Sequence, residues 1–298
     1  MPSELPKRII VLGPMRSGTS LTADLIRRWG AYSGGEEQLW KSDVSDPRGY
    51  GYMEYIPLQE LNDELLDQND RVPPTQEDME AKAANPALRK KGLDLLTRMD
   101  QEAQQNDSGA WVWKDARLPL TLPFWMQLWG EPAFVITVRH PADMALSSAK
   151  TEDVSEENFP FSAAFLYWQF CMLNILSVTQ DSPFKMYISY EDLVGDPLYQ
   201  CGRLATFLNK VSGQLTDDSN DKLPSMLQHV QATQRHHRYS KSLAEMNQAT
   251  REQRALYNFL RVKTLYPDEP FQESDFALYP GWKEYLQVID AAFNLGQS

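Results

Sequence analysis

The sequence predicts an α/β fold, with a doubly wound, mainly parallel sheet flanked by helices. Short unbroken apolar runs alternate along the chain with longer amphipathic stretches, a pattern typical of βαβ units. The first apolar run, over residues 8–12, passes directly into a glycine-bracketed loop and then into the start of a helix. No break in composition marks a linker, so residues 1–298 are expected to form a single domain.

Apolar patterning predicts the elements of the first half of the chain. Unbroken apolar runs indicate buried strands over residues 8–12, 111–113 and 133–138. Apolar residues at helical spacing predict helices over residues 19–30, 57–68, 86–104, 118–129 and 141–150. The stretch from Arg71 to Asn85 is polar and contains prolines, so a loop is expected there.

The second half continues the same alternation. An acidic stretch over residues 151–158 is expected to be a solvated loop, and an aromatic-rich helix is expected over 159–179. A strand over 184–189 and a helix over 197–208 follow, and the chain from Leu223 onward is expected to form helices and loops. The aromatic residues of the long helix are expected in the core, where some of them could also line a pocket.

Composition limits the classes of partner and compartment. The chain has 29 Lys and Arg against 41 Asp and Glu, a formal net charge of −12. Nucleic acid is therefore not expected as a partner, because duplex binding depends on clustered basic residues. Cys171 and Cys201 form no CxxC pair, which fits a reducing compartment. No signal peptide and no apolar run of membrane-span length is expected, so the protein is predicted to be cytoplasmic, without a membrane span.

The glycine-bracketed loop, residues 13–20, predicts an anion site. Gly13 and Gly18 have P-loop spacing, but Thr19 stands where a P-loop nucleotide hydrolase has its lysine. Backbone N–H groups and the positive end of the helix dipole would bind phosphate or sulfate there, and Arg16 would supply the charge. The alternative interpretation is a glycine-rich turn of the kind found in any doubly wound fold.

Three other segments follow predicted strands. They are Trp113-Lys114-Asp115, Val138-Arg139-His140-Pro141 with Ser147 further on, and Tyr190-Glu191-Asp192-Leu193. Ligands of open parallel sheets bind outside the carboxyl ends of the strands. All these segments and the loop are therefore expected to converge on one edge.

Over residues 8–195 the sequence resembles the sulfotransferases that use 3′-phosphoadenosine 5′-phosphosulfate (PAPS). Arg-Ser-Gly-Thr-Ser at 16–20 is similar to the loop of tyrosylprotein sulfotransferases and many bacterial members. Arg139 and Ser147 have the family's Arg-to-Ser spacing, and Tyr190-Glu191-Asp192-Leu193 resembles its Tyr-Glu-Asp-Leu segment. Lys114-Asp115 resembles the family's Lys-Asp-Pro element, although Ala116 replaces the proline.

One further segment resembles a bacterial subgroup. Asp46-Pro47-Arg48-Gly49-Tyr50, followed by Glu54, is similar to the pattern Asn-Pro-Lys-Gly-Tyr-Phe-Glu. Gly51, Tyr52 and Met53 separate Tyr50 from Glu54, so the alignment is imperfect.

The resemblance implies a P-loop-like sulfotransferase architecture, PAPS as sulfuryl donor and 3′,5′-diphosphoadenosine (PAP) as product. It implies that Ser17, Gly18, Thr19 and Ser20 donate hydrogen bonds to the 5′-phosphosulfate. Arg16 would bridge the 5′-phosphate and the sulfuryl oxygens. Arg139 and Ser147 would hold the 3′-phosphate, and Tyr190 would belong to the same donor site. Lys114 would stabilise charge on the leaving oxygen, with a surface lysine or an Asp115 pair as the alternative.

A sulfuryl group carries less charge than a phosphoryl dianion, so no metal is expected to be required. The acceptor, a small molecule or a glycan or peptide hydroxyl (or an amine), needs a general base. Glu37 is the leading candidate, because its spacing from Arg16 is similar to that of the glutamate in tyrosylprotein sulfotransferases. Glu36, Glu54 and His140 are the others, and His140 is expected to turn toward structure instead.

Two alternative functions remain open from the sequence. A P-loop kinase would need Mg²⁺ and ATP, and Thr19 in place of lysine argues against it. A non-catalytic nucleotide-binding protein would keep the loop without the chemistry. The basic cluster Arg235-His236-His237-Arg238 is expected to be a helix surface or a second anion contact, because no metal-ligand pattern accompanies its histidines.

Overall fold

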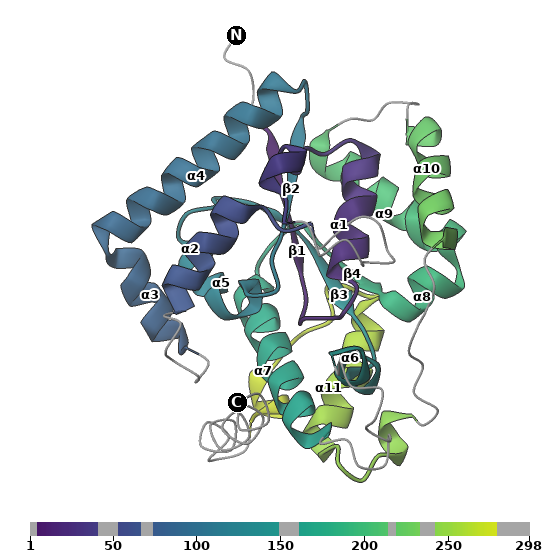
Figure 1. Cartoon of the computed structure of the whole chain (residues 1–298). Helices are drawn as coiled ribbons and strands as arrows, with labels where there is room; N and C mark the ends of the chain where they lie inside the picture. Colours follow the sequence, from purple (N-terminus) through teal and green to yellow (C-terminus); the bar gives the residue numbers. More distant parts are fainter. Residues whose placement is uncertain are drawn as a thin grey trace, which may run out of the picture.

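The computed structural model contains a four-stranded sheet in which every pair of neighbouring strands is parallel (Figure 1). The structure describes residues 5–40, 53–66, 74–148, 161–213, 219–232 and 242–278. The strand order is β2-β1-β3-β4. The strands are β1 (Lys7–Leu12), β2 (Ala110–Lys114), β3 (Ala133–Val138) and β4 (Lys185–Ser189). The predicted α/β class and the predicted strands are confirmed.

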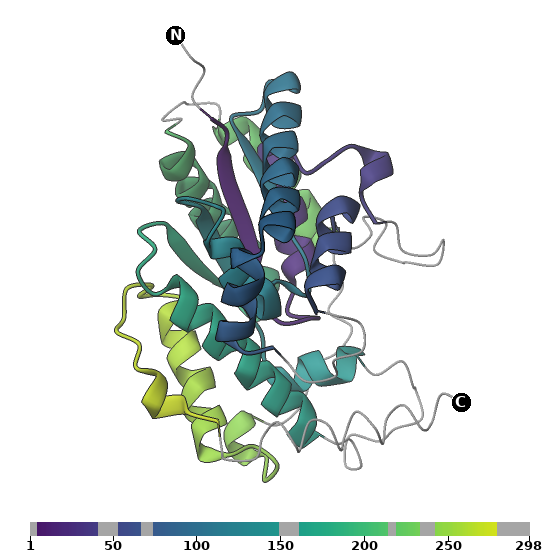
Figure 2. The ribbon, with the colours of Figure 1, turned by 90° about the vertical axis from the view of Figure 1, so that its left-hand side faces the viewer.

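Helices cover both faces of the sheet because successive strand residues point to opposite sides. In β1, Ile9 and Val11 face one helix layer, and Ile10 and Leu12 face the other. The first layer contains α1 (Thr19–Trp29), α8 (Tyr190–Gly195), α9 (Pro197–Ser212) and α10 (Ser219–Ala232). The second layer contains α2 (Ile56–Leu66), α3 (Gln76–Ala84), α4 (Pro86–Gln105), α5 (Leu118–Met126), α7 (Phe161–Thr179) and α11 (Arg251–Lys263). Figure 2 looks onto this second layer, with α2 and α4 in front.

A smaller apolar cluster lies at the start of α7. It joins α6 (Pro141–Ser148) to Phe161 and Phe165 of α7 and to the short helix η3 (Leu243–Glu245). Two further short helices are η1 (Glu36–Gln38) and η4 (Glu273–Phe276). The loop predicted at 151–158 lies outside the described residues.

Helix α3 corrects the loop predicted from Arg71 to Asn85. Thr75 caps it: the Thr75 hydroxyl accepts from the Asp78 N–H at 3.1 Å, and Asp78 accepts from the Thr75 N–H at 2.9 Å. Such a reciprocal cap stabilises a short helix whose composition is otherwise polar. Met79 and Ala83 are buried against the second layer, so tertiary packing outweighed the polar composition.

Helix α7 corrects a second expectation. Its most apolar 18-residue window has a mean hydropathy of 1.4, so by length and composition α7 could cross a membrane, although no such run was expected from the sequence. Of its most apolar window, 67% is buried inside the protein. Because these side chains pack on β3, α5 and α11 residues of the core, α7 has the burial of a core helix.

Candidate functional site

The carboxyl ends of the strands bring the predicted segments together at one edge of the sheet. Lys114 pairs with Val11 near the end of β1, which leads into the glycine-bracketed loop. Val138 pairs with Ser189, so the residues that follow them, Arg139 and Tyr190, emerge side by side. We call the loop 13–18 with Lys114, Arg139 and Tyr190 the strand-end site.

Close packing fixes the loop of the strand-end site. The Ser17 hydroxyl lies 2.7 Å from the Thr137 hydroxyl, and both are buried. A Cβ added at Gly13 would lie 2.1 Å from Thr137 Oγ1. Gly18 has a φ of +96°, and a Cβ there would lie 2.5 Å from the Tyr190 ring. Glycine is therefore required at 13 and 18, and the Ser17 side chain fastens the loop to β3.

The first turn of α1 lacks a side-chain cap. Its N-cap residue is Gly18, no side chain caps it, and no acidic residue lies in its first turn. By contrast, the starts of α3, α4, α9 and α11 are capped by the side chains of Thr75, Asn85, Asp196 and Thr250. The first N–H groups of a helix have no intrahelical acceptor. This helix start is therefore suited to binding an anion.

Arg16 joins the loop to α6. Its backbone has a φ of +67°, and its Nε donates to the Ser147 carbonyl at 3.1 Å and to the Ser147 hydroxyl at 3.0 Å. Arg139 donates to the Arg16 carbonyl oxygen at 2.8 Å. The structure thus brings Arg16 together with Arg139 and Ser147, which lie 123 and 131 positions later in the chain, and all three were predicted for donor binding.

Arg139 is a buried cation, 6% exposed. Its guanidinium carbon lies 4.3 Å from the centroid of the Tyr190 ring. Burial lowers the pKa of Arg139, and the nearby Arg16 charge acts in the same direction. Its buried Nε has no hydrogen-bond partner within the described ranges. A buried arginine with an unused donor is suited to an anionic ligand.

Lys114 is held rigidly at the end of β2. The preceding residue, Trp113, makes edge contacts with Trp125 at 4.6 Å and with Trp129 at 5.7 Å between ring centroids. The Lys114 Nζ lies 2.8 Å from Glu54 Oε1, and the two side chains are only 3% and 10% exposed. This buried ion pair is at the strand-end site, beside the end of β1.

The local backbone delivers Glu54 to Lys114. Leu39 and Tyr55 form an antiparallel bridge, and the Trp40 N–H donates to the Glu54 carbonyl at 2.8 Å. Met53, immediately before it, has a φ of +59°, a conformation that non-glycine residues rarely adopt. Glu54 therefore belongs to the strand-end site.

Glu36 and Glu37 lie elsewhere, exposed in η1. That turn is tied to α4: Gln38 donates to Glu102 at 3.3 Å, and the Tyr32 hydroxyl donates to Glu102 at 3.0 Å. Of the predicted glutamates, the one that the structure pairs with another predicted catalytic residue is Glu54.

His140 turns toward structure, as expected from its position after Arg139. Its N–H donates to Glu191 at 2.9 Å, and its Nδ1 accepts from the Ala142 N–H at 3.3 Å. Its ring meets the Tyr257 ring at 5.2 Å between centroids. His140 thus supports the turn between β3 and α6.

Asp115, from the predicted Lys114-Asp115 segment, forms a network with Arg117, which the sequence did not single out. The buried Asp115 accepts from Asn62 at 3.0 Å and from the Arg117 N–H at 2.8 Å. Arg117 also pairs with Asp63. Burial lowers the pKa of Arg117, but the charges of Asp115 and Asp63 outweigh it and raise that pKa. This network holds the turn that follows Lys114.

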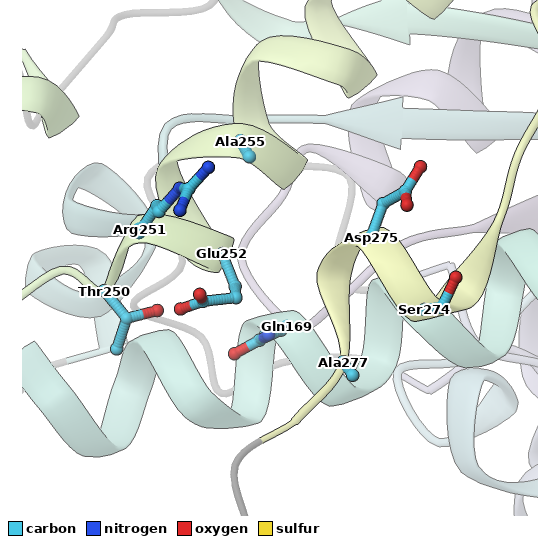
Figure 3. A pocket seen from close by; sticks show the side chains of 8 residues that line it. All are labelled: Gln169, Thr250, Arg251, Glu252, Ala255, Ser274, Asp275 and Ala277. Carbon is cyan, nitrogen blue, oxygen red and sulfur yellow. The ribbon is translucent and has the colours of Figure 1, made fainter.

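A cavity of about 700 Å³ lies away from the strand-end site, between α7, α11 and η4 (Figure 3). Gln169, Thr250, Glu252 and Asp275 are among its lining residues. Gln169 is buried and already bonded to the Phe276 carbonyl and to Gln253. In the part of the chain that the structure describes, no group of three or more His, Cys, Asp or Glu side chains could hold a metal ion. The basic cluster at 235–238 and the segment 46–50 lie outside the described residues.

Comparison with known proteins bears on the strand-end site. A family model described as "Sulfotransferase family" matches residues 6–210. The matched span includes the loop 13–18, Glu54, Lys114, Arg139 and Tyr190, and it ends before α11. Among curated protein sequences, no significant match to the chain was found.

Several solved structures are similar to the chain. The sulfotransferase domain of the Synechococcus PCC 7002 olefin synthase is 18% identical, with a TM-score of 0.45 over 98% of this chain and 97% of that one. The sulfotransferase domain from the curacin biosynthetic pathway is 20% identical, with a TM-score of 0.42 over 98% and 99%. A sulfotransferase from Mycobacterium tuberculosis H37Rv is 17% identical, with a TM-score of 0.42 over 88% and 77%.

Proposed function

Because the chain belongs to the sulfotransferase family, we propose that it transfers a sulfuryl group from PAPS to an acceptor hydroxyl or amine. The observation that carries the proposal is a convergence at one sheet edge. An uncapped helix start, two arginines in contact and a buried lysine–glutamate pair all meet at the strand-end site. This convergence supports the proposal that anion binding and proton transfer occur at neighbouring positions.

Arg139 fits a 3′-phosphate. Its buried Nε has an unused donor, and its guanidinium carbon lies over the Tyr190 ring. Ser147 lies within reach of the same region through its contact with Arg16. A bidentate arginine would distinguish a 3′-phosphorylated nucleotide from ATP or ADP.

The start of α1 fits the 5′-phosphosulfate. The backbone N–H groups of Gly18, Thr19 and Ser20 would donate to it, and Arg16 would neutralise its charge. Ser17 contributes differently from the sequence expectation, because its hydroxyl is turned to Thr137 inside the protein. We assign to Ser17 the role of holding the loop in shape.

PAPS supplies an electrophilic sulfuryl group whose bond to the bridging oxygen breaks as the acceptor oxygen or nitrogen attacks in line. Lys114 would stabilise the negative charge that develops on the bridging oxygen. Glu54, 2.8 Å from Lys114, would accept the proton of the acceptor. We propose Glu54 as the base over Glu37 and Glu36, because it is the carboxylate that lies in the strand-end site.

The test of the donor is ligand binding to the purified chain. PAP should raise the Tm far more than ADP or AMP at equal concentration, since a tight ligand stabilises the folded state by mass action. Equal shifts for PAP and ADP would contradict recognition of a 3′-phosphate.

The test of the reaction is a screen of sulfate transfer from labelled PAPS to pooled acceptors. Turnover is expected to persist in EDTA, because side-chain cations and N–H groups provide the charge stabilisation. A strict requirement for Mg²⁺ together with ATP turnover would instead favour a kinase.

A further inference from the structure

Helix α11 lies beyond the residues that the family model matches, yet it packs behind the strand-end site. The match ends at residue 210, and α11 begins at Arg251. In Figure 1 it lies beside α6 and below β3 and β4. Its Leu256 and Leu260 are fully buried in the second helix layer, so its position relative to the sheet is fixed by the core.

Two polar side chains of α11 reach the turns that follow β3 and β4. The Tyr257 ring meets the His140 ring edge-on, with 5.2 Å between the centroids and 77° between the planes. The Arg261 guanidinium lies 3.0 Å from Asp192 Oδ1 in α8. One side chain thus contacts the turn after β3, and the other contacts the helix after β4.

Glu191 links these two contacts. One of its carboxylate oxygens accepts from the His140 N–H at 2.9 Å, and the other accepts from the Ser189 hydroxyl at 3.1 Å. Burial raises the pKa of Tyr257, and the charge of Glu191 raises it further. The charge of Glu191 also acts to raise the pKa values of Arg261 and Arg139. Glu191 therefore lies at the centre of the group formed by His140, Tyr257, Arg261 and Arg139.

The residues that α11 contacts are direct neighbours of the donor site along the chain. His140 follows Arg139, and Glu191 and Asp192 follow Tyr190. Arg139 and Tyr190 stack on each other at 4.3 Å, and Tyr190 closes against Gly18. A shift of either turn would therefore change how the Arg139 guanidinium faces a ligand.

We propose that α11 is a positioning element for recognition of the 3′-phosphate, acting through Arg261 on α8 and through Tyr257 on the turn at His140. This inference rests on the proposed donor. Neither residue touches the ligand. Both keep the Arg139 guanidinium and the Tyr190 ring in the positions that the donor site requires. The ability to discriminate between a 3′-phosphorylated and a plain nucleotide depends on these positions.

The test compares the affinities of the full chain for PAP and for AMP by isothermal titration calorimetry. In Arg261→Ala, the preference for PAP over AMP should fall by about threefold to tenfold, the usual range for coupling through an intermediate residue. Arg261→Lys should restore most of it, because a lysine can still pair with Asp192. Tyr257→Leu, which removes the ring contact with His140, should lower the preference in the same direction.

Arg254→Ala is the matched control on the same helix. Arg254 donates to the Met246 carbonyl at 2.8 Å, and not to His140 or Asp192. Its loss should lower the Tm without changing the PAP-to-AMP preference. An unchanged preference in both Arg261→Ala and Tyr257→Leu, or an equal loss of affinity for both nucleotides, would overturn the inference. A wild-type chain with no preference for PAP would instead overturn the proposed donor.

Discussion

At the scale of single residues, the strand-end site depends on two strained positions. Arg16 and Met53 have φ angles of +67° and +59°. Such angles cost about 1 kcal/mol or more for non-glycine residues and persist only where the surroundings enforce them. At Arg16 the conformation turns the carbonyl toward Arg139, and at Met53 it precedes the residue that meets Lys114. The strain is therefore located where it orients side chains of the candidate site.

Glu54→Gln should abolish most turnover while PAP still binds. Gln keeps the shape of the side chain but cannot accept the acceptor's proton, so a loss of about a hundredfold or more is expected. Glu37→Gln and Glu36→Gln are the controls, because both lie exposed in η1. Steady-state kinetics with labelled PAPS measures all three. A dead Glu37→Gln beside an active Glu54→Gln would show that the base was assigned to the wrong carboxylate.

Lys114→Met should lower turnover by about a hundredfold, on the scale of losing one charge partner of the transition state. It also leaves the Glu54 carboxylate buried without its cation, which destabilises the fold. The double variant Lys114→Met/Glu54→Gln should therefore regain much of the Tm but no activity. Recovery of turnover in the double variant would mean that Lys114 serves only to neutralise Glu54, and that Glu54 is not the base.

At the scale of elements, the ring of Tyr190 from α8 packs against Gly18 at the uncapped start of α1. The glycine lets the ring approach and lets the helix begin in a left-handed residue. Elsewhere in the structure, Thr75 caps α3 with its own side chain. The sequence at the start of a helix thus distinguishes two cases. In one, a side chain caps the first N–H groups, and in the other these N–H groups are left open for a ligand.

Gly18→Ala should lower the affinity for PAP by about tenfold or more, since the new methyl group would push the Tyr190 ring and Arg139 away. Gly130→Ala is the matched control, because Gly130 also has a positive φ, +70°, but nothing lies within 4 Å of an added Cβ. It should cost about 1 kcal/mol of stability without changing the affinity for PAP. Calorimetry and thermal unfolding separate the two effects, and equal affinities in both variants would contradict the proposed packing.

At the scale of the whole molecule, the first helix layer is joined by a charge cluster remote from the strand-end site. The buried Asp24 of α1 pairs with Arg27 at 2.6 Å, with Arg28 at 2.7 Å and with His229 of α10 at 3.0 Å. Burial alone would raise the pKa of Asp24, but the bonds from His229 and Arg28 and the charge of Arg27 bring it well below the usual 3.8. The cluster therefore attaches α10 to α1 only while Asp24 is ionised.

This depressed pKa predicts an acid-sensitive contribution to stability. Asp24 is protonated more readily in the unfolded chain than in the folded one. The stabilisation by this charge cluster is therefore present above about pH 4 and is lost as the pH falls below it. Asp24→Asn should lower the free energy of unfolding at pH 7 by about 3 kcal/mol, the scale for breaking a buried pair. It should also flatten the dependence of stability on pH below about pH 4.

Urea unfolding at a series of pH values measures both effects. Asp94→Asn is the control, since Asp94 pairs with Lys90 on the surface with its side chain 60% exposed, and such pairs contribute little. Identical pH profiles for Asp24→Asn and the wild-type chain would contradict the role given to the cluster.

Local patterns predicted much of the architecture and part of the site. The apolar runs at 8–12, 111–113, 133–138 and 184–189 became strands, because a buried parallel strand needs an apolar side chain on both faces. The end of each strand then placed Arg139, Lys114 and the loop 13–18 at one edge. A signal for Glu54 was also available, since Gly51-Tyr52-Met53-Glu54 follows the bacterial Gly-Tyr-Phe-Glu pattern when it is aligned on the second Gly-Tyr pair.

What the sequence by itself determined is the α/β class, the sulfotransferase family and the glycine-bracketed loop before the first helix, because each depends on short-range periodicity or on contiguous motifs. Only the tertiary structure decided that Glu54 rather than Glu37 meets Lys114, since that contact depends on the bridge between Leu39 and Tyr55. It also decided that Tyr257 meets His140 and that Arg16 meets Ser147. These contacts join segments far apart in the chain, and their geometry is set by core packing that no local pattern encodes.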